Sequence, residues 1–354
     1  MKVQRYPGDE MTPMERQKAA REGRETDRIP CVPFMGMLKA KLAGIPFREY
    51  ATQPSAMAEG EIFVYENFGC DRAWIGPNTR GLTEALGGVF TYPPDGTPYL
   101  EKRHIDTYDQ LDHMEPVDAR RDQKIRSFLQ AAEILTDRGL TQLVPTEMSI
   151  GGPFTIASNL RGAEMLLRDC RRSPQQVHRL LRLVTDSEKS CIDAAGDYGL
   201  GIAMADPVAS PGLIGPKMYQ EFVYPYTKEL TEYAQSKIKK KVSLHMCGKT
   251  YSIWKYFRQY PLNEISLDNI IQMDRAVQEL GDVIPLAGNV DPVETILHGT
   301  KEEITRAVHS CIQKGLPAKA GYTLASGCDI PERASAHQIQ WFMEAARNYP
   351  ACHA

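Results

Sequence analysis

The chain has 354 residues, of which 42% are hydrophobic, and its 42 basic and 45 acidic side chains leave a formal charge of −3. This length suits either two average domains or one large α/β barrel, and the balanced charge argues against a nucleic-acid partner. The charged N-terminus lacks the apolar core of a secretory signal, and no apolar run is long enough to span a membrane. We therefore expect a soluble, cytoplasmic protein that binds neither nucleic acid nor a membrane.

Apolar strand candidates alternate with amphipathic helices along most of the chain. The predicted strands are RIPCVPF, DRAWIG, LVPTEM, GIAMADP, KVSLHMCG, EISLDN, VIPLAGNVDP and AGYTLASGCD. The predicted helices cover 13–23, 54–68, 122–138, 160–198 with a break at Pro174, 216–236, 251–259, 272–280, 301–314 and 331–347. Strands that recur between helices form parallel sheets. Eight of them predict an α/β fold, a single (β/α)8 TIM barrel over residues 1–354.

Two segments add to this barrel. Residues 1–28 are predicted to form an N-terminal helical extension. Residues 77–120 are rich in Gly, Pro and Tyr and contain the turn sequence PPDG, which predicts a hairpin-like excursion over the mouth of the barrel. The aromatic residues in and beside this excursion are candidates either for lining a small pocket or for the core of the hairpin. They are Trp74, Phe90, Tyr92 and Tyr99.

Polar residues gather where the predicted strands end, which is the end that carries the active site of a TIM barrel. These residues are Glu147, Asp206, His245, Cys247, Asp268, Asn289, Asp291 and Cys328. Asp206 and Glu147 are candidates for steering a proton or hydroxyl of a substrate, although a helix cap or a buried salt bridge explains each equally well. Asp291 precedes a proline, and capping of the next helix accounts for it.

The sequence His245-Met246-Cys247 closes one of the strands. Because alternate side chains share one face of a strand, His245 and Cys247 should point together into the barrel mouth. Cys328 follows Ser-Gly at the end of the last predicted strand. One imidazole and two thiols are ligands that Zn²⁺ prefers, and three protein ligands leave the open position of a catalytic zinc site. The pattern alone also allows two other interpretations, core packing and a catalytic thiol.

Five segments of the sequence are distinctive: MTPMERQKAAREGRETDRIPCVPF, GGPFTIASNLRGAEMLLRD, HMCGKT, LAGNVDPVETILHGTKEEI and SGCDIPERASAHQIQWFMEAAR. They resemble the uroporphyrinogen decarboxylase superfamily, and within it the zinc-dependent, corrinoid-linked methyltransferase branch. The likeness covers nearly the whole chain. It implies that His245, Cys247 and Cys328 bind zinc. Some members add an acidic ligand, for which Asp268 is the best match and Glu264 a weaker one, and Asp268 is therefore also a catalytic candidate.

The resemblance implies an enzyme that moves a methyl group to or from the cobalt of a corrinoid. None of the eight histidines has Asp two residues before it and Gly three residues after it, as a cobalamin-binding motif requires. The cobalamin is therefore expected on a separate corrinoid protein that docks over the barrel mouth, with Asn289 as a contact for the cofactor. Where true decarboxylases carry arginines that grip substrate carboxylates, this chain reads PFMGMLKAKLAGIP, which argues against decarboxylation.

We expect a first-step demethylase that moves a methyl group from a methoxylated compound, such as an aryl methyl ether, to cob(I)alamin. Zinc would act as a Lewis acid on the ether oxygen. The alternative is a second-step enzyme that moves the methyl group from methylcobalamin to a thiol such as coenzyme M, or to another carrier, with zinc favouring the thiolate. Uroporphyrinogen decarboxylase and a non-catalytic, zinc-stabilised binding protein are the further alternatives. Besides the corrinoid protein, the expected partner is a small-molecule methyl donor or acceptor. The candidate oligomer is a homodimer.

Overall fold

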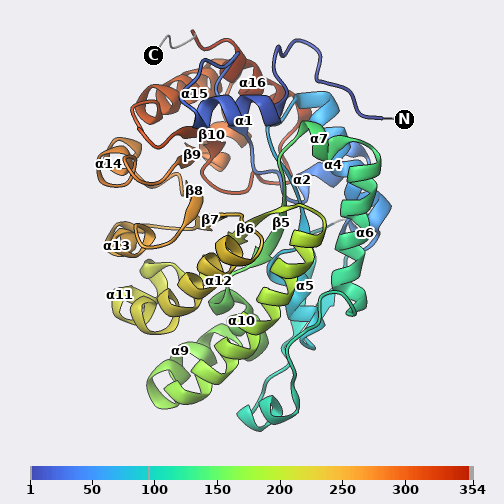
Figure 1. Cartoon of the computed structure of the whole chain (residues 1–354), viewed down its shortest axis with the longest axis vertical. Helices are drawn as coiled ribbons and strands as arrows, with labels where there is room; N and C mark the ends of the chain where they lie inside the picture. Colours follow the sequence, from blue (N-terminus) through green and yellow to red (C-terminus); the bar gives the residue numbers. More distant parts are fainter. Residues whose placement is uncertain (1, 95, 351–354) are drawn as a thin grey trace. The chain divides into compact units, whose positions relative to one another are not determined.

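The computed structural model describes residues 2–94 and 96–350 (Figure 1). Cys352, which the sequence assigns to the C-terminal tail, lies outside them. The chain divides into two compact units. Unit 1 comprises Met1–Ala73, Ala131–Thr146 and Glu264–Ala354, and unit 2 comprises Trp74–Gln130 and Glu147–Asn263. A single domain over the whole chain stays a prediction.

Unit 1 contains four parallel strands in the order β1-β10-β9-β8. They are β1 (Cys31–Val32), β8 (Leu262–Leu267, whose first two residues belong to unit 2), β9 (Leu286–Val290) and β10 (Tyr322–Ser326). The helices are α1 (Pro13–Arg21), α2 (Leu38–Ala43), α3 (Phe47–Thr52), α4 (Pro54–Phe68), α7 (Leu140–Leu143), α14 (Met273–Glu279), α15 (Lys301–Gly315) and α16 (Ala336–Arg347). Every residue of β9 and β10 is buried, as expected for parallel strands covered by helices.

A buried ion-pair network fastens α1 within unit 1. The Arg16 side chain is wholly buried and pairs with Asp27 at 2.7 Å, with Asp9 at 3.1 Å, and with Asp71. Arg28 pairs with Asp9 at 2.7 Å and also with Asp71. The predicted N-terminal extension is therefore helical at α1 and is held to the rest of unit 1 by charge as well as by packing.

Unit 2 contains four parallel strands in the order β7-β6-β5-β2. They are β2 (Ala73–Pro77) and β5 (Thr146–Gly151), whose first residues belong to unit 1, together with β6 (Gly201–Ala205) and β7 (Val242–Met246). The helices are α5 (Asn78–Ala85), α8 (Pro153–Arg161), α9 (Ala163–Arg172), α10 (Pro174–Asp197), α11 (Pro211–Phe222), α12 (Tyr224–Lys237) and α13 (Trp254–Phe257), while α6 (Gln123–Asp137) runs from unit 2 into unit 1. Helices α10 and α12 pack beside β6 and β7 (Figure 1).

The excursion forms the predicted hairpin, with β3 (Val89–Thr91) antiparallel to β4 (Tyr99–Lys102). Its aromatic side chains do not line one pocket. Tyr92 bonds to Glu84 of α5 and to Lys124 of α6, Tyr99 is 57% exposed, and the Trp74 indole N–H bonds to Glu147 on β5. The position of this hairpin over the barrel mouth stays a prediction.

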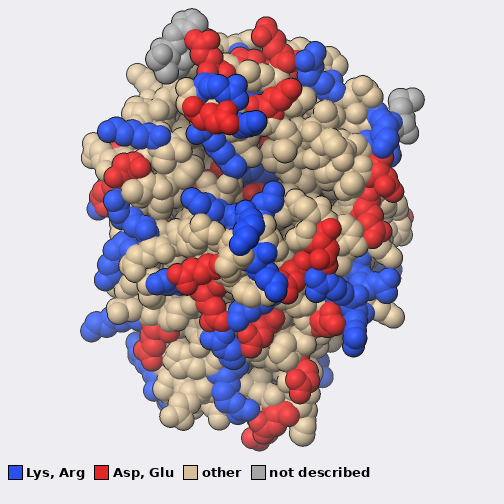
Figure 2. All heavy atoms as spheres, viewed as in Figure 1, with Lys and Arg blue, Asp and Glu red and all other residues tan. Residues whose placement is uncertain are grey.

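The eight strands alternate with helices along the chain, which confirms the predicted (β/α)8 class. All eight lie within or beside the predicted segments, and the predicted break at Pro174 separates α9 from α10. No helix within residues 2–94 and 96–350 combines the length and apolar character needed to cross a membrane. Basic and acidic side chains are interspersed on the face drawn in Figure 2, in keeping with the balanced charge of the sequence.

Candidate metal centre

Strand β7 presents His245 and, one residue beyond its end, Cys247. The His245 Nε2 atom lies 3.3 Å from the Cys247 Sγ atom, whereas Met246 between them is 1% exposed. The two ligands therefore share a face, as the alternation of a strand requires. Gly248 follows with a φ of +83°, and a Cβ atom there would lie 2.5 Å from the Ser210 hydroxyl. This tight turn after the two ligands accordingly needs glycine.

Cys328 lies two residues beyond β10, on a turn that is fixed by its backbone. The N–H of Gly327 donates to the carbonyl of Val290 at 2.8 Å. A Cβ atom at Gly327 would lie 2.3 Å from the backbone nitrogen of Asn269. Only glycine allows so close an approach, and the turn that carries the Cys328 thiol is thereby held against the loop after β8.

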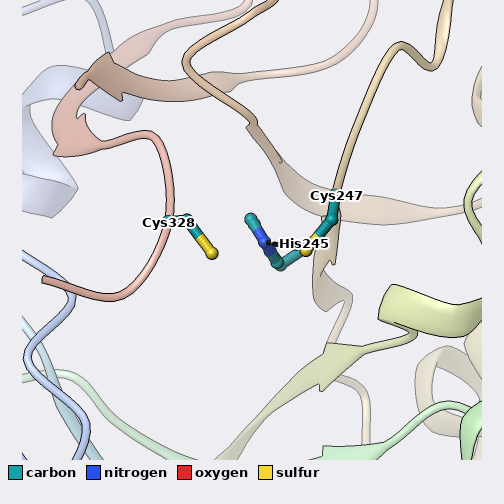
Figure 3. A group of neighbouring side chains, drawn as sticks. All are labelled: His245, Cys247 and Cys328. Carbon is teal, nitrogen blue, oxygen red and sulfur yellow. Dashed lines mark hydrogen bonds between the residues drawn. The ribbon is translucent and has the colours of Figure 1, made fainter. Parts of the chain in front are cut away.

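The ligand atoms of His245, Cys247 and Cys328 all lie within 4.8 Å of one another (Figure 3). Two ligands of one tetrahedral zinc ion stand about 3.5–3.8 Å apart, given bonds of 2.0–2.3 Å, so small side-chain movements suffice for a common ion. Two thiols and one imidazole are also the donor set of a known class of catalytic zinc site. In the part of the chain that the structure describes, no other three His, Cys, Asp or Glu side chains are grouped in this way.

The two acidic matches for a further ligand do not join this group. Asp268 follows β8 and accepts a hydrogen bond from the N–H of Ile270 at 3.1 Å, which shapes the turn after the strand. Glu264 is buried on β8 and forms an ion pair with Arg72, with Nη2 and Oε2 3.1 Å apart. The structure therefore gives no support for either as a zinc ligand.

Asn289 lies on β9 and holds the loop after β8. Its Nδ2 donates to the carbonyls of Asp268 at 2.9 Å and Ile271 at 2.7 Å. The Cys311 thiol of α15 is 3.9 Å from its Oδ1, so the amide faces the helix that covers β9. Both bonds engage the side-chain amide with the loop after β8, and the expectation that Asn289 contacts a cofactor stays a prediction.

Glu147 lies at the beginning of β5 and not at its end. The strand spans Thr146–Gly151, so Glu147 is its second residue, whereas the sequence predicted it at the end. Its carboxylate accepts hydrogen bonds from Ser243 at 2.6 Å and from the Trp74 indole at 3.1 Å, each the second residue of its own strand. Glu147 is thus a buried polar link between the beginnings of three strands. Its predicted position at the end of the strand is wrong, and a catalytic role for it stays a prediction.

Asp206 directly follows β6 and is 1% exposed. Its Oδ1 accepts hydrogen bonds from the backbone N–H of Thr155 at 2.8 Å and from the hydroxyl of Thr155 at 2.6 Å. These bonds cap the first turn of α8 from a neighbouring strand. No local sequence signal marks Thr155, because the capping residue does not directly precede the helix in the chain. The Oδ2 atom is buried without a partner, and burial raises the pKa of the carboxyl to about 6. Asp291, in contrast, caps the short helix Pro292–Leu297 after β9, as predicted, and accepts hydrogen bonds from the N–H groups of Val293 and Glu294 at 2.8 Å.

A further buried carboxyl, Glu188 on α10, is wholly enclosed, and neither of its oxygens has a partner. Burial, and then the charge of Asp206, raise its pKa well above the ordinary value of 4.5. The folded state therefore holds a proton that the unfolded state releases, so this group stabilises the fold below pH 4.5 and loses that contribution as the pH rises through its folded pKa. We expect Glu188→Gln to reduce the fall in the free energy of unfolding as the pH rises, measured by urea titration from pH 4 to 8.

The control for this prediction is Glu232→Gln, because the Glu232 side chain is 56% exposed. This variant should show the same pH dependence as the parent protein. A Glu188→Gln variant with an unchanged slope would contradict the inference that the buried carboxyl is protonated.

Eight parallel strands alternating with helices, and two thiols beside an imidazole, define an α/β barrel with a candidate zinc centre. The model of the family "Uroporphyrinogen decarboxylase (URO-D)" matches residues 12–349, and the chain belongs to this family. The resemblance seen in the sequence is thereby confirmed.

Similar proteins include both methyltransferases and decarboxylases. The methylcobamide:CoM methyltransferase MtbA of Methanosarcina mazei is 25% identical over 96% of this chain and 99% of its own length. MtaA of Methanosarcina barkeri, with the same described activity, is 25% identical over 97% and 99%. The uroporphyrinogen decarboxylase of Danio rerio is 26% identical over 94% and 92%. A solved structure, a methyltransferase from Methanosarcina mazei, has the same fold, with a TM-score of 0.83, 22% identity, and coverage of 95% of this chain and 98% of that one.

Proposed function

We propose that the protein is a zinc-dependent methyltransferase that moves a methyl group from a methylated corrinoid to a thiol. The observation that carries this proposal is the grouping of His245, Cys247 and Cys328 within 4.8 Å. Two relatives that match almost the whole chain are methylcobamide:CoM methyltransferases. They favour the second-step reaction, which was the alternative in the sequence analysis, over demethylation of a methoxylated compound.

The donor set fits a zinc ion that binds a thiol substrate. The three side chains would hold the metal and leave one position for the sulfur of the acceptor. Zinc at this site would favour the thiolate form of the substrate, which is the nucleophile. The thiol proton must then leave, and Asp206 Oδ2, buried and without a partner beside the strand that carries His245, is the proposed acceptor.

The methyl transfer forms a bond between the sulfur and the methyl carbon and breaks the bond between that carbon and cobalt. The electron pair of the broken bond stays with the corrinoid, so no further oxidant or reductant is required. The chain lacks the cobalamin-binding motif sought in its sequence. We therefore propose that the methylated corrinoid is presented by a separate corrinoid protein.

The test is transfer from methylcobalamin to coenzyme M by the purified, zinc-loaded protein. We expect methylcobalamin to be consumed, with one methylated thiol formed per cobalamin, measured by absorbance and mass spectrometry. A strong chelator should abolish the reaction, and added zinc should restore it. Demethylation of a methoxylated aromatic compound by cob(I)alamin, with no transfer to thiols, would instead favour the first-step enzyme. Decarboxylation of uroporphyrinogen that persists after chelation would contradict both methyltransferase hypotheses.

A further inference from the structure

Arg80, in the first turn of α5, is a cation without an acidic partner. Its Nε atom is buried and has no hydrogen-bond acceptor. Its guanidinium carbon lies 5.7 Å from the centre of the Tyr92 ring, and no carboxylate of residues 2–94 and 96–350 forms an ion pair with it. Leaving a buried charged donor unsatisfied costs free energy, so this position suits an arginine that binds an anion from outside the chain.

The acidic residue of this cluster is already neutralised by another cation. Glu84 accepts the Tyr92 hydroxyl at 2.6 Å and pairs with Lys124 at 2.8 Å. Lys124 also donates to the Tyr92 oxygen at 2.6 Å. Burial, and then the bond to Glu84, raise the pKa of Tyr92, although the charge of Arg80 and a hydrogen bond from its side chain act in the opposite direction. Arg80 therefore contacts a neutral phenol, and no carboxylate among the described residues is paired with its positive charge.

Arg80 and His245 belong to the same edge of the sheet in unit 2. Asn78, the first residue of α5, bridges to Ile150 near the end of β5. The end of β5 pairs with the end of β6, and Ala205 of β6 pairs with His245. Three strand spacings, about 14 Å measured along the sheet, connect the start of α5 with the backbone of β7. A long arginine side chain and a small bound molecule can together bridge that separation.

We propose that Arg80 binds an anionic group, a sulfonate or a carboxylate, carried by the thiol that accepts the methyl group. This inference rests on the proposed function, because the sulfur of the same molecule would be held by His245, Cys247 and Cys328. The planar guanidinium matches the paired oxygens of such a group with two parallel hydrogen bonds. Arg80 would thus determine which thiols are accepted, without contacting the reacting atoms.

The experiment compares 2-mercaptoethanesulfonate with neutral 2-mercaptoethanol as acceptors in the zinc-loaded protein and in Arg80→Gln. We expect Arg80→Gln to raise the KM for the sulfonate about 10- to 100-fold, the usual effect of a lost charge-assisted hydrogen bond. The KM for 2-mercaptoethanol should change less than about twofold, because it has no anionic group. Arg80→Lys should recover part of the loss. Arg121→Gln, whose side chain is 88% exposed, should leave both KM values unchanged.

A second measurement does not depend on turnover. Ethanesulfonate, which has no thiol, should bind to the zinc-free protein in calorimetry and bind more weakly to Arg80→Gln. Unchanged sulfonate KM and binding would overturn the proposal, and an equal rise in KM for both thiols would show that Arg80 is only structural. If the parent protein methylates no thiol but loses ethanesulfonate binding on Arg80→Gln, the proposed function fails while the anion site stands.

Discussion

Replacement of Cys328 by serine will remove most of the bound zinc and abolish methyl transfer while the barrel stays folded. The serine hydroxyl is not ionised at neutral pH and is a poor zinc ligand, so zinc affinity should fall by at least about 100-fold. The thiol is only partly buried, and its turn is held by the backbone of Gly327. Serine therefore fits without strain. Metal analysis of the purified variant, with circular dichroism as the measure of folding, checks both parts of this result.

Cys311→Ser is the matched control for the loss of a thiol. Cys311 is also only partly buried, but it lies on α15 and does not belong to the three-ligand group. This variant should retain the zinc content of the parent protein. Full zinc occupancy in Cys328→Ser would mean that the metal, if bound, uses other ligands, and the proposed centre would then be wrong.

Replacement of Arg16 by methionine should destabilise the protein by about 3–5 kcal/mol, the typical cost of removing one partner from a buried ion pair. The side chain of Arg16 is 0% exposed, and it pairs with Asp9, Asp27 and Asp71. Methionine fills much of the same space but leaves buried carboxylates short of positive charge. The free energy of unfolding from urea titration measures the loss.

The control is Arg24→Met, because the pair between Arg24 and Glu22 is exposed, at 55% and 47%. Such surface pairs contribute little, so the change should stay within about 0.5 kcal/mol. A loss below about 1 kcal/mol in Arg16→Met would show that the network does not depend on this arginine.

The strands could be predicted from the sequence because each is a short apolar run between amphipathic helices. The residues at which the strands end could not be predicted in this way. The run that contains Glu147 continues through Met148 and Ile150, both buried, so the strand extends beyond the residue predicted to close it. Hydrophobic pattern shows that a strand exists, but the point where pairing stops depends on neighbouring strands. That error placed Glu147 at the active-site end of the barrel.

In the candidate metal centre, too, features within one strand could be predicted and contacts between distant segments could not. His245 and Cys247 could be paired from the sequence because two positions on one strand share a face whatever the tertiary structure. The contacts of Glu264 and Asn289 could not be predicted from the sequence, because their partners are distant in the chain. Arg72, for example, is 192 positions from Glu264. Arg80 gives no signal in the sequence either. Its distinctive property is a buried Nε atom without a hydrogen-bond acceptor, which only the fold reveals.

The discontinuity of unit 1 has a consequence for synthesis on the ribosome. All of unit 2 has been made once Asn263 is added, whereas unit 1 still lacks Glu264–Ala354. At 5–20 residues per second, that last segment takes roughly 5–18 s. The interval matters because Arg347, near the end of the chain, bonds to Asp9, 338 positions earlier. The nascent N-terminal segment must therefore wait in an unassembled state, which makes it the part of a stalled or truncated product that chaperones and proteases would meet first.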